Sequence, residues 1–145
     1  MRIHIFQDEE SLHLAVAKEL IEAVKTKPNT VLGLSTGSSP LGTYANMIKD
    51  HQMNGTDYSE VVTFNLDEYV GLEGTHPQSY RHFMNTSLLN HLNIPLNQTN
   101  VPDGTGDLKK TCENYEAKIV SAGGIDLQLL GIGTNGHIGF NEPGT

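Results

Sequence analysis

The chain has little cysteine, no tryptophan and few basic residues, and each shortage limits what it can be. Its 145 residues include one cysteine, Cys112, so an internal disulfide is excluded and a reducing compartment, the cytoplasm, is expected. Nine Lys and Arg stand against seventeen Asp and Glu, which gives a formal net charge of −8. This charge repels phosphate polyanions and anionic membranes, so neither a nucleic acid nor a membrane is an expected partner.

Long apolar runs are also lacking. No segment approaches the roughly 18 consecutive apolar residues that suggest a membrane-spanning helix. The N-terminus, Met1-Arg2-Ile3-His4-Ile5-Phe6, is too short and too alternating for a signal peptide. We interpret residues 2–6 as a short first strand, and we expect Cys112 to be an inert, half-buried residue of a helix.

Strand-like and helix-like segments alternate along the chain. The predicted strands are residues 2–6, 30–34, 61–66, 99–101 and a buried strand from Ile125. The predicted helices cover residues 9–25, 40–49 and 78–91 and a last segment after Asp107. This pattern predicts an α/β fold with a doubly wound, mostly parallel sheet and helices on both faces, which is a Rossmann-like arrangement.

Capping residues set the expected helix limits. Asp8 and Asp107 are predicted N-caps, and Ser39 is a predicted N-cap with Pro40 at the first helical position. A polar connection is expected from His51 to Glu60.

Polar residues collect where three predicted strands end, which is where parallel sheets bind ligands. The first group is Ser35, Thr36, Gly37, Ser38 and Ser39, a loop that opens a helix and offers N–H groups and hydroxyls to a phosphate-sized anion. It lacks the lysine spacing of a P-loop. An ordinary strand-to-helix turn capped by serine explains this segment equally well.

The second group is Asp67-Glu68. Neighbouring strand residues point to opposite faces, so we expect one carboxylate in a cleft and the other against a helix or a structural partner. A carboxylate at the mouth of the sheet suits a general base. A helix cap or a solvated acid is the alternative for an isolated Asp.

The third group is the glycine-rich segment from Gly131 to Thr145, which contains Asn135, His137 and Glu142. A histidine suits proton transfer near neutral pH, and a carboxylate that accepts from one ring nitrogen would fix its tautomer. The seven histidines are scattered, with no tight His/Cys cluster, so no metal site is expected.

Four motifs together resemble the glucosamine-6-phosphate deaminase family. They are Leu34 to Pro40, Phe64-Asn65-Leu66-Asp67-Glu68-Tyr69-Val70-Gly71-Leu72, His76-Pro77-Gln78-Ser79-Tyr80, and Gly131 to Gly144. The resemblance implies an enzyme that converts glucosamine 6-phosphate to fructose 6-phosphate and ammonia, through ring opening and an enolamine, without a metal or organic cofactor. A small sugar phosphate is the implied partner, and a homo-oligomer is left open.

The resemblance also implies individual roles. Asp67 matches the base that moves a proton from C2 to C1, and His137 matches the residue that opens the ring. Glu142 matches the carboxylate that supports the histidine. Residues 35–39 with Gly136 match part of the phosphate site.

Asn135 stands where many members of the family carry Asp. It can orient the imidazole but cannot stabilise the imidazolium by charge. We therefore expect the protonated ring to be less stable here than in an Asn135→Asp variant.

Chains of the family run well past residue 145. We therefore expect residues 1–145 to be a single α/β domain that forms the N-terminal part of a longer catalytic domain, and this part alone to lack activity. Within the chain, Arg81 is the basic residue nearest a motif.

Two alternatives to the deaminase remain open. A 6-phosphogluconolactonase has a similar fold and a similar Gly-x-Gly-x-(Asp/Asn)-Gly-His pattern, but Asp67-Glu68-Tyr69 and Asn141 to Gly144 match the deaminase better. A sugar-phosphate-sensing domain would need the anion loop but not Asp67, His137 and Glu142 together.

Overall fold

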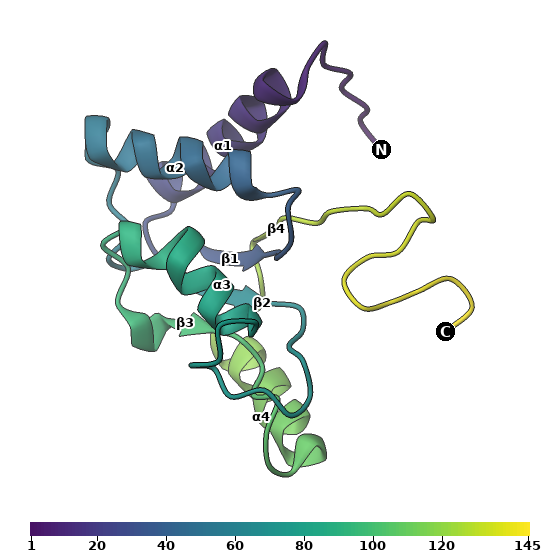
Figure 1. The fold of residues 1–145 in the computed structure, drawn as a ribbon. Helices are drawn as coiled ribbons and strands as arrows, with labels where there is room; N and C mark the ends of the chain where they lie inside the picture. Colours follow the sequence, from purple (N-terminus) through teal and green to yellow (C-terminus); the bar gives the residue numbers. More distant parts are fainter.

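The computed structural model describes residues 1–145 and has a parallel sheet between helices (Figure 1). The elements follow in the order α1 (Glu9–Thr26), β1 (Val31–Leu34), α2 (Leu41–Asn54), β2 (Val62–Asn65), α3 (Tyr80–Ser87), η1 (Leu89–His91), η2 (Leu96–Gln98), β3 (Thr99–Asn100), α4 (Leu108–Ser121) and β4 (Leu127–Gln128). The predicted α/β alternation is confirmed. No helix combines the length and the apolar character needed to cross a membrane.

The strand order fixes where a ligand can bind. The sheet runs β3-β2-β1-β4, and every pairing is parallel. From β1 the chain builds outward through β2 to β3 and then returns to place β4 on the other side of β1. The order therefore reverses between β1 and β4, and the crevice beyond the carboxyl ends of strands at such a switch point is the usual ligand site.

The main core lies on one face of the sheet. Leu32 and Leu34 of β1 belong to a buried cluster that also takes residues from α1, α2 and α3, among them Leu20, Tyr44 and Met84. This packing follows from the apolar stripe of α1, whose buried residues recur at helical spacing. The three helices hold the carboxyl ends of β1 and β2 firmly in place.

Helix α4 covers the opposite face. Its Tyr115 ring meets the Phe64 ring of β2 edge to face, with centroids 5.6 Å apart. The Tyr115 hydroxyl donates to the backbone oxygens of Asn65 and Asn100, at 2.8 and 3.1 Å, and so ties α4 to β2 and β3. Helices therefore flank both faces, as the sequence predicted.

Two predicted helix starts are confirmed by their caps. The Asp8 carboxylate accepts from the Ser11 N–H at 2.7 Å, and the Asp107 carboxylate accepts from the Lys110 N–H at 3.2 Å. Each cap satisfies an N–H that the first helical turn leaves free.

The predicted strand at residues 2–6 is wrong. These residues have no regular structure and take part in no backbone hydrogen bond, and Ile3 and Ile5 are exposed. In Figure 1 the N-terminal segment extends from the start of α1 and does not reach the sheet. An alternating pattern does not form a strand without a neighbour to pair with.

The predicted bounds of two helices are also wrong. Helix α2 begins at Leu41 without a side-chain cap, so Ser39 is not its N-cap and Pro40 is not its first residue. It continues to Asn54 and ends at Gly55, within the segment predicted as a polar connection. The third predicted helix begins at Tyr80 and gives way to the short turn η1.

The predicted burial near the end of the chain is also wrong. Strand β4 has only two paired residues, both half-buried, because the edge of the sheet lies open there. Cys112 is exposed, because α4 touches the sheet along a narrow line and buries no residue fully.

Candidate active site

A cleft of about 250 Å³ lies beyond the carboxyl ends of the strands, at the switch point. It brings together segments that are far apart in the sequence. It is lined by Ser35, Thr36, Gly37, Ser38, Ser39, Asn65, Leu66, Asp67, Tyr80, Gly131, Ile132, Gly133, His137 and Gly139. The three predicted strand-end groups therefore meet in one place.

The loop of residues 35–39 forms one wall. Its first residue is fixed, because the Ser35 N–H donates to the Tyr44 hydroxyl at 3.1 Å. The backbone N–H groups of residues 36–39 donate to no acceptor in the protein, and the loop leads directly into α2. Free N–H groups at the start of a 14-residue helix suit an anion.

Asp67 and Glu68 diverge, as predicted. Asp67 lines the cleft, where its Oδ2 accepts from the Phe140 N–H at 2.9 Å. Glu68 turns to the start of α3 and accepts from the N–H groups of Tyr80 and Arg81, each at 2.9 Å. The interpretation as a solvated acid or helix cap therefore fits Glu68 rather than Asp67.

The environment of Asp67 favours its neutral form. Burial raises the pKa of the Asp67 carboxyl, the Phe140 N–H lowers it in part, and the negative charge of Glu68 raises it again. A carboxylate with a raised pKa is a stronger base when it is ionised, and ionisation persists at neutral pH unless the shift is very large.

His137 also lines the cleft and is oriented through Asn135. The Asn135 Nδ2 donates to Glu142 Oε2 at 2.7 Å, and Asn135 Oδ1 lies 2.7 Å from His137 Nδ1. An ionised carboxylate can only accept, so the amide must turn its oxygen to the ring. Nδ1 then carries the proton and Nε2 is free to accept one.

Glu142 therefore supports His137 mainly through Asn135. Its Oε1 lies 3.7 Å from His137 Nδ1, which is too far for a hydrogen bond. Neither Glu142 nor Asn135 lines the cleft. Gly136 lies outside the lining too, at a turn with φ +88°.

Two glycines permit this arrangement. A Cβ at Gly133 would lie 2.2 Å from the His137 ring, so only glycine lets the imidazole rest on the backbone. Gly139 has φ +58°, and a Cβ there would lie 2.6 Å from Asp67 Oδ2. The glycine-rich composition is thus explained by close approach to the two candidate acid–base residues.

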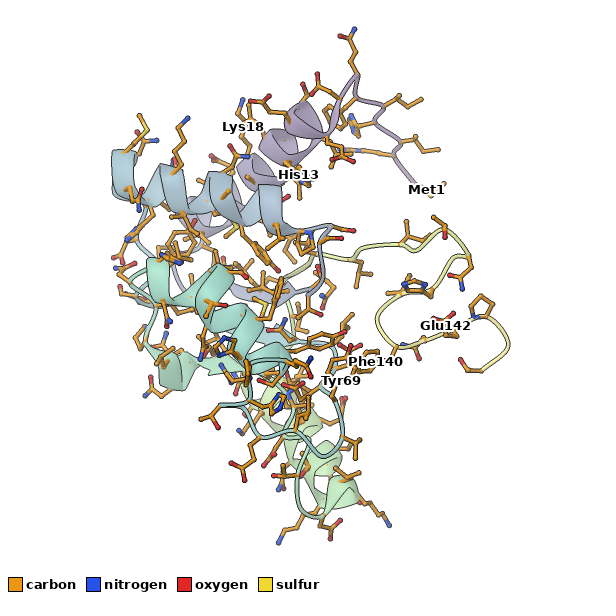
Figure 2. The ribbon with its side chains drawn as sticks, viewed as in Figure 1. Met1, His13, Lys18, Tyr69, Phe140 and Glu142 are labelled. Atoms are coloured by element: carbon orange, nitrogen blue, oxygen red, sulfur yellow. The ribbon has the colours of Figure 1, made fainter.

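An aromatic cluster joins the C-terminal loop to the segment after β2 and to the start of α3. Phe140 lies beside Tyr69 and Tyr80, with ring centroids 5.0 and 5.4 Å away. Figure 2 shows Tyr69 and Phe140 close together, with Glu142 farther out on the loop. Burial, with the neighbouring Tyr69 as a further cause, raises the pKa of the Tyr80 hydroxyl, which stays neutral.

Three contributors were missed by the sequence analysis. Tyr80 and Asn65 line the cleft, and Phe140 bonds to Asp67. A polar Asn at the end of an apolar strand was the available signal for Asn65, whereas nothing in the sequence marks the contacts of Phe140.

The cleft has no Lys or Arg side chain and no cluster of metal-binding side chains. No Lys or Arg lines it, and Arg81 turns away to Thr99, donating to its side chain at 2.8 Å and its carbonyl at 2.9 Å. No group of three or more His, Cys, Asp or Glu side chains is arranged to hold a metal ion.

Comparison with known proteins identifies the family. Residues 7–139 match the family model of glucosamine-6-phosphate isomerases/6-phosphogluconolactonases. The chain belongs to this family.

Within the family, the deaminases are much more similar to the chain than the lactonases. A glucosamine-6-phosphate deaminase of Geobacillus sp. (strain WCH70) is 56% identical over 137 residues, which are 94% of this chain and 55% of the relative. A monomeric glucosamine-6-phosphate deaminase of known structure is 42% identical with a TM-score of 0.97, and covers all of this chain and 61% of its own. The chain thus spans little more than half the length of these relatives.

The lactonase branch shares only the fold at this level of similarity. The 6-phosphogluconolactonase from Thermotoga maritima has a TM-score of 0.77 over 94% of this chain and 62% of its own, with 21% identity.

Proposed function

We propose that residues 1–145 belong to the catalytic domain of an isomerising deaminase, which converts glucosamine 6-phosphate and water to fructose 6-phosphate and ammonia. One observation carries the proposal: Asp67 and His137 line the same cleft, each fixed by a hydrogen bond, beside a loop with free N–H groups. The 56% identity to a deaminase supports the choice of reaction.

The phosphate binds at the loop of residues 35–39. The unpaired N–H groups of residues 36–39 and the start of α2 favour its negative charge. Gly37, with φ +93° and open space around its Cα, lets the loop curve around the anion. Gly136, which the resemblance placed at the phosphate site, lies outside the cleft lining, and its N–H already donates to the Gly133 carbonyl, so it is left out of the proposed phosphate site.

Ring opening is assigned to His137. The Nδ1 proton is held by Asn135, so Nε2 takes the proton from the anomeric hydroxyl and returns it to the ring oxygen as the C1–O5 bond breaks. Glu142 keeps Asn135 in the required orientation. The product of this step is the open-chain aldehyde.

Asp67 then moves a proton from C2 to C1. Its carboxylate removes the C2 proton to give an enolamine and delivers a proton to C1, which leaves an imine at C2. Water adds to C2, and ammonia leaves as the ketone of fructose 6-phosphate forms. The raised pKa of Asp67 suits both removal and return of the proton.

The cellular compartment of the reaction is inferred from the single cysteine. The free, exposed Cys112 fits a reducing compartment, so we place the enzyme in the cytoplasm. The sugar phosphate is the proposed partner, and the chain itself carries no argument for a homo-oligomer.

The deciding experiment measures ammonia release from glucosamine 6-phosphate by the full-length protein. We expect release with fructose 6-phosphate as the other product. Hydrolysis of 6-phosphogluconolactone without ammonia release would replace the proposal with a lactonase, and sugar-phosphate binding without turnover would replace it with a sensor.

A further inference from the structure

Two buried oxygen atoms that belong to cleft-lining residues have no hydrogen-bond partner. Five buried side-chain polar atoms of the protein lack one, and only Ser35 Oγ and Asn65 Oδ1 belong to residues that line the cleft. Ser35 belongs to the anion loop already described. Asn65 has no role in the proposed mechanism, although its side chain is in the most protected part of the cleft, with only 3% of the residue exposed.

The orientation of the Asn65 amide follows from its contacts. Its Nδ2 donates to the Leu34 carbonyl at 3.1 Å, across the register pair that joins the ends of β1 and β2. A carbonyl can only accept, so the amide nitrogen must face Leu34 and the amide oxygen must be the free atom. Asn65 Oδ1 is therefore an acceptor that requires a donor.

The backbone holds this acceptor rigidly. On the other face of the sheet, the Tyr115 hydroxyl accepts from the Asn65 N–H at 3.1 Å and donates to the Asn65 carbonyl at 2.8 Å. The residue cannot swing away to find a partner elsewhere. A fixed, buried, unpaired acceptor beside a ligand cleft is arranged for a ligand rather than for stability.

The position of the acceptor relates it to the chemistry. Asn65 precedes Asp67 by two residues, and both line the same cleft. A ligand group that donates to Asn65 Oδ1 would thus fix the substrate close to the carboxylate that removes the C2 proton. The oxygen is uncharged, so it selects an O–H or N–H donor without attracting the phosphate.

We propose that Asn65 is a specificity-determining residue whose Oδ1 accepts a hydrogen bond from one hydroxyl or amino group of the sugar phosphate and so sets the substrate against Asp67. This inference rests on the proposed deaminase function. It adds a residue that selects the substrate by a donor group on the sugar, apart from the phosphate and apart from the acid–base residues.

The test uses Asn65→Leu in the full-length protein, with Thr63→Val as the matched control. Thr63 is on the same strand, is 2% exposed and also has an unpaired buried oxygen, but it does not line the cleft. We expect kcat/KM for ammonia release to fall roughly 10- to 100-fold in Asn65→Leu and to stay within about twofold in Thr63→Val.

Analogues of glucosamine 6-phosphate, each with one hydroxyl or the amino group replaced by hydrogen, separate specificity from general damage. Their affinities are measured by calorimetry in Asp67→Asn, with and without Asn65→Leu, because the active protein would convert glucosamine 6-phosphate during the measurement. One analogue should bind more weakly than glucosamine 6-phosphate to Asp67→Asn, and this difference should disappear when Asn65→Leu is added. If every analogue loses the same affinity in both proteins, the inference is overturned.

A measurement on the unsubstituted protein covers the case in which Asn65→Leu does not fold. The carbon-13 resonance of the Asn65 side-chain carbonyl should move downfield when glucosamine 6-phosphate binds. An unchanged resonance at saturation would overturn the inference.

The experiments distinguish failure of the proposed function from failure of the role of Asn65. A protein that binds glucosamine 6-phosphate but releases no ammonia overturns the deaminase reaction, and the analogue series still decides the role of Asn65. A protein that neither binds nor converts it overturns both. A deaminase whose kcat/KM is unchanged in Asn65→Leu overturns the role of Asn65 alone.

Discussion

The two sides of the cleft are held in place by different means. The sheet side, with Asn65 and Asp67, continues from a strand whose residues are almost fully buried, and its packing reaches the main core. The loop side, with His137, is mostly exposed and is ordered by bonds within the loop and by Phe140. In Figure 1 this loop stands out from the body of the sheet and helices. One candidate proton carrier is therefore positioned by the fold, and the other by local contacts.

This difference predicts that substitutions on the two sides of the cleft have different effects on stability and activity. Substitutions on the sheet side should affect folding and chemistry together, whereas substitutions on the loop side should affect chemistry with little loss of stability. All expected activities refer to the full-length protein.

The largest effect is expected from Asp67→Asn. Without a carboxylate to move the C2 proton, kcat should fall by about 10²- to 10⁴-fold, while the affinity for glucosamine 6-phosphate is kept. Ammonia release and calorimetry measure the two quantities. A variant with normal turnover would exclude Asp67 as the base.

The same variant tests whether the buried carboxylate of Asp67 makes the folded protein less stable at neutral pH. Burial raises the pKa of Asp67 above its ordinary value of 3.8, so its contribution to stability is complete below pH 3.8 and is lost as pH rises through the folded-state pKa. Asp67→Asn should therefore melt at a higher temperature than the unsubstituted protein at pH 7. The two melting temperatures should converge in acid, and a less stable variant at pH 7 would contradict this.

On the loop side, Gly133→Ala should cost activity without stability. Its Cβ would meet the His137 ring and displace it, and a displacement of about 1 Å is enough for a roughly 10²-fold loss of kcat. The melting temperature should hardly change. Gly131→Ala is the control, because its Cβ would meet only Ser39 at 3.8 Å, and its loss of kcat should be clearly smaller.

Glu68→Ala should do the reverse and reduce stability. It removes the acceptor of two N–H groups at the start of α3, at a cost of about 1–2 kcal/mol in the free energy of unfolding. Denaturant unfolding measures the loss. Glu73→Ala is the control, because Glu73 lies in the same segment between β2 and α3 and its exposed carboxylate accepts no hydrogen bond. Equal losses of stability in the two variants would refute the capping role of Glu68.

Glu68→Ala also has an expected signature in the pH profile. The negative charge of Glu68 contributes to the raised pKa of Asp67, so its removal should lower that pKa. The acid limb of kcat/KM should move to lower pH, since Asp67 must be ionised to act. A limb that moves to higher pH would contradict the assignment.

Phe140→Ala should loosen the junction between the two sides. Loss of the contacts with Tyr69 and Tyr80 should lower kcat/KM about threefold to tenfold, because the docked loop becomes less populated. The Phe140 N–H then bonds to Asp67 for less of the time, so the pKa of Asp67 should rise further and the acid limb should move to higher pH. Phe140→Tyr keeps the ring and should retain the profile.

Asn135→Asp is expected to have the smallest effect. A second carboxylate beside the ring stabilises the imidazolium form of His137, so a larger fraction of the ring should be protonated at any given pH. Titration of the imidazole resonances by NMR compares the two proteins. Identical titrations would refute the expected effect.

The sequence predicted the fold well where local chemistry decides it. The caps at Asp8 and Asp107 and the alternation of strands and helices needed no knowledge of distant contacts. Residues 2–6 failed because alternation describes a strand but does not supply a neighbour. The predicted start of α2 was wrong because Ser39, a residue type favoured at N-caps, does not cap this helix. The geometry of the loop, rather than residue preference, sets the helix start.

The candidate site was predictable as a set of residues but not as a geometry. The positions of the predicted strand ends indicated that residues 35–39, Asp67 and His137 lie at the same edge of the sheet. The path from Glu142 through Asn135 to the ring depends on how the loop curls, and the bond from Phe140 to Asp67 joins residues 73 positions apart. Neither follows from residue types or spacing.

The short strand β4 also governs the order in which the molecule assembles. It pairs with β1 through Leu32 and Leu127, and the Lys27–Asp126 contact beside it joins residues 99 positions apart. Closing so long a stretch of chain is entropically unfavourable and comes late, whereas the core residues before β4 leave the ribosome first. An intermediate would thus have Asp67 in place before His137 joins it at the cleft. During refolding, ammonia release should appear after helix content has recovered.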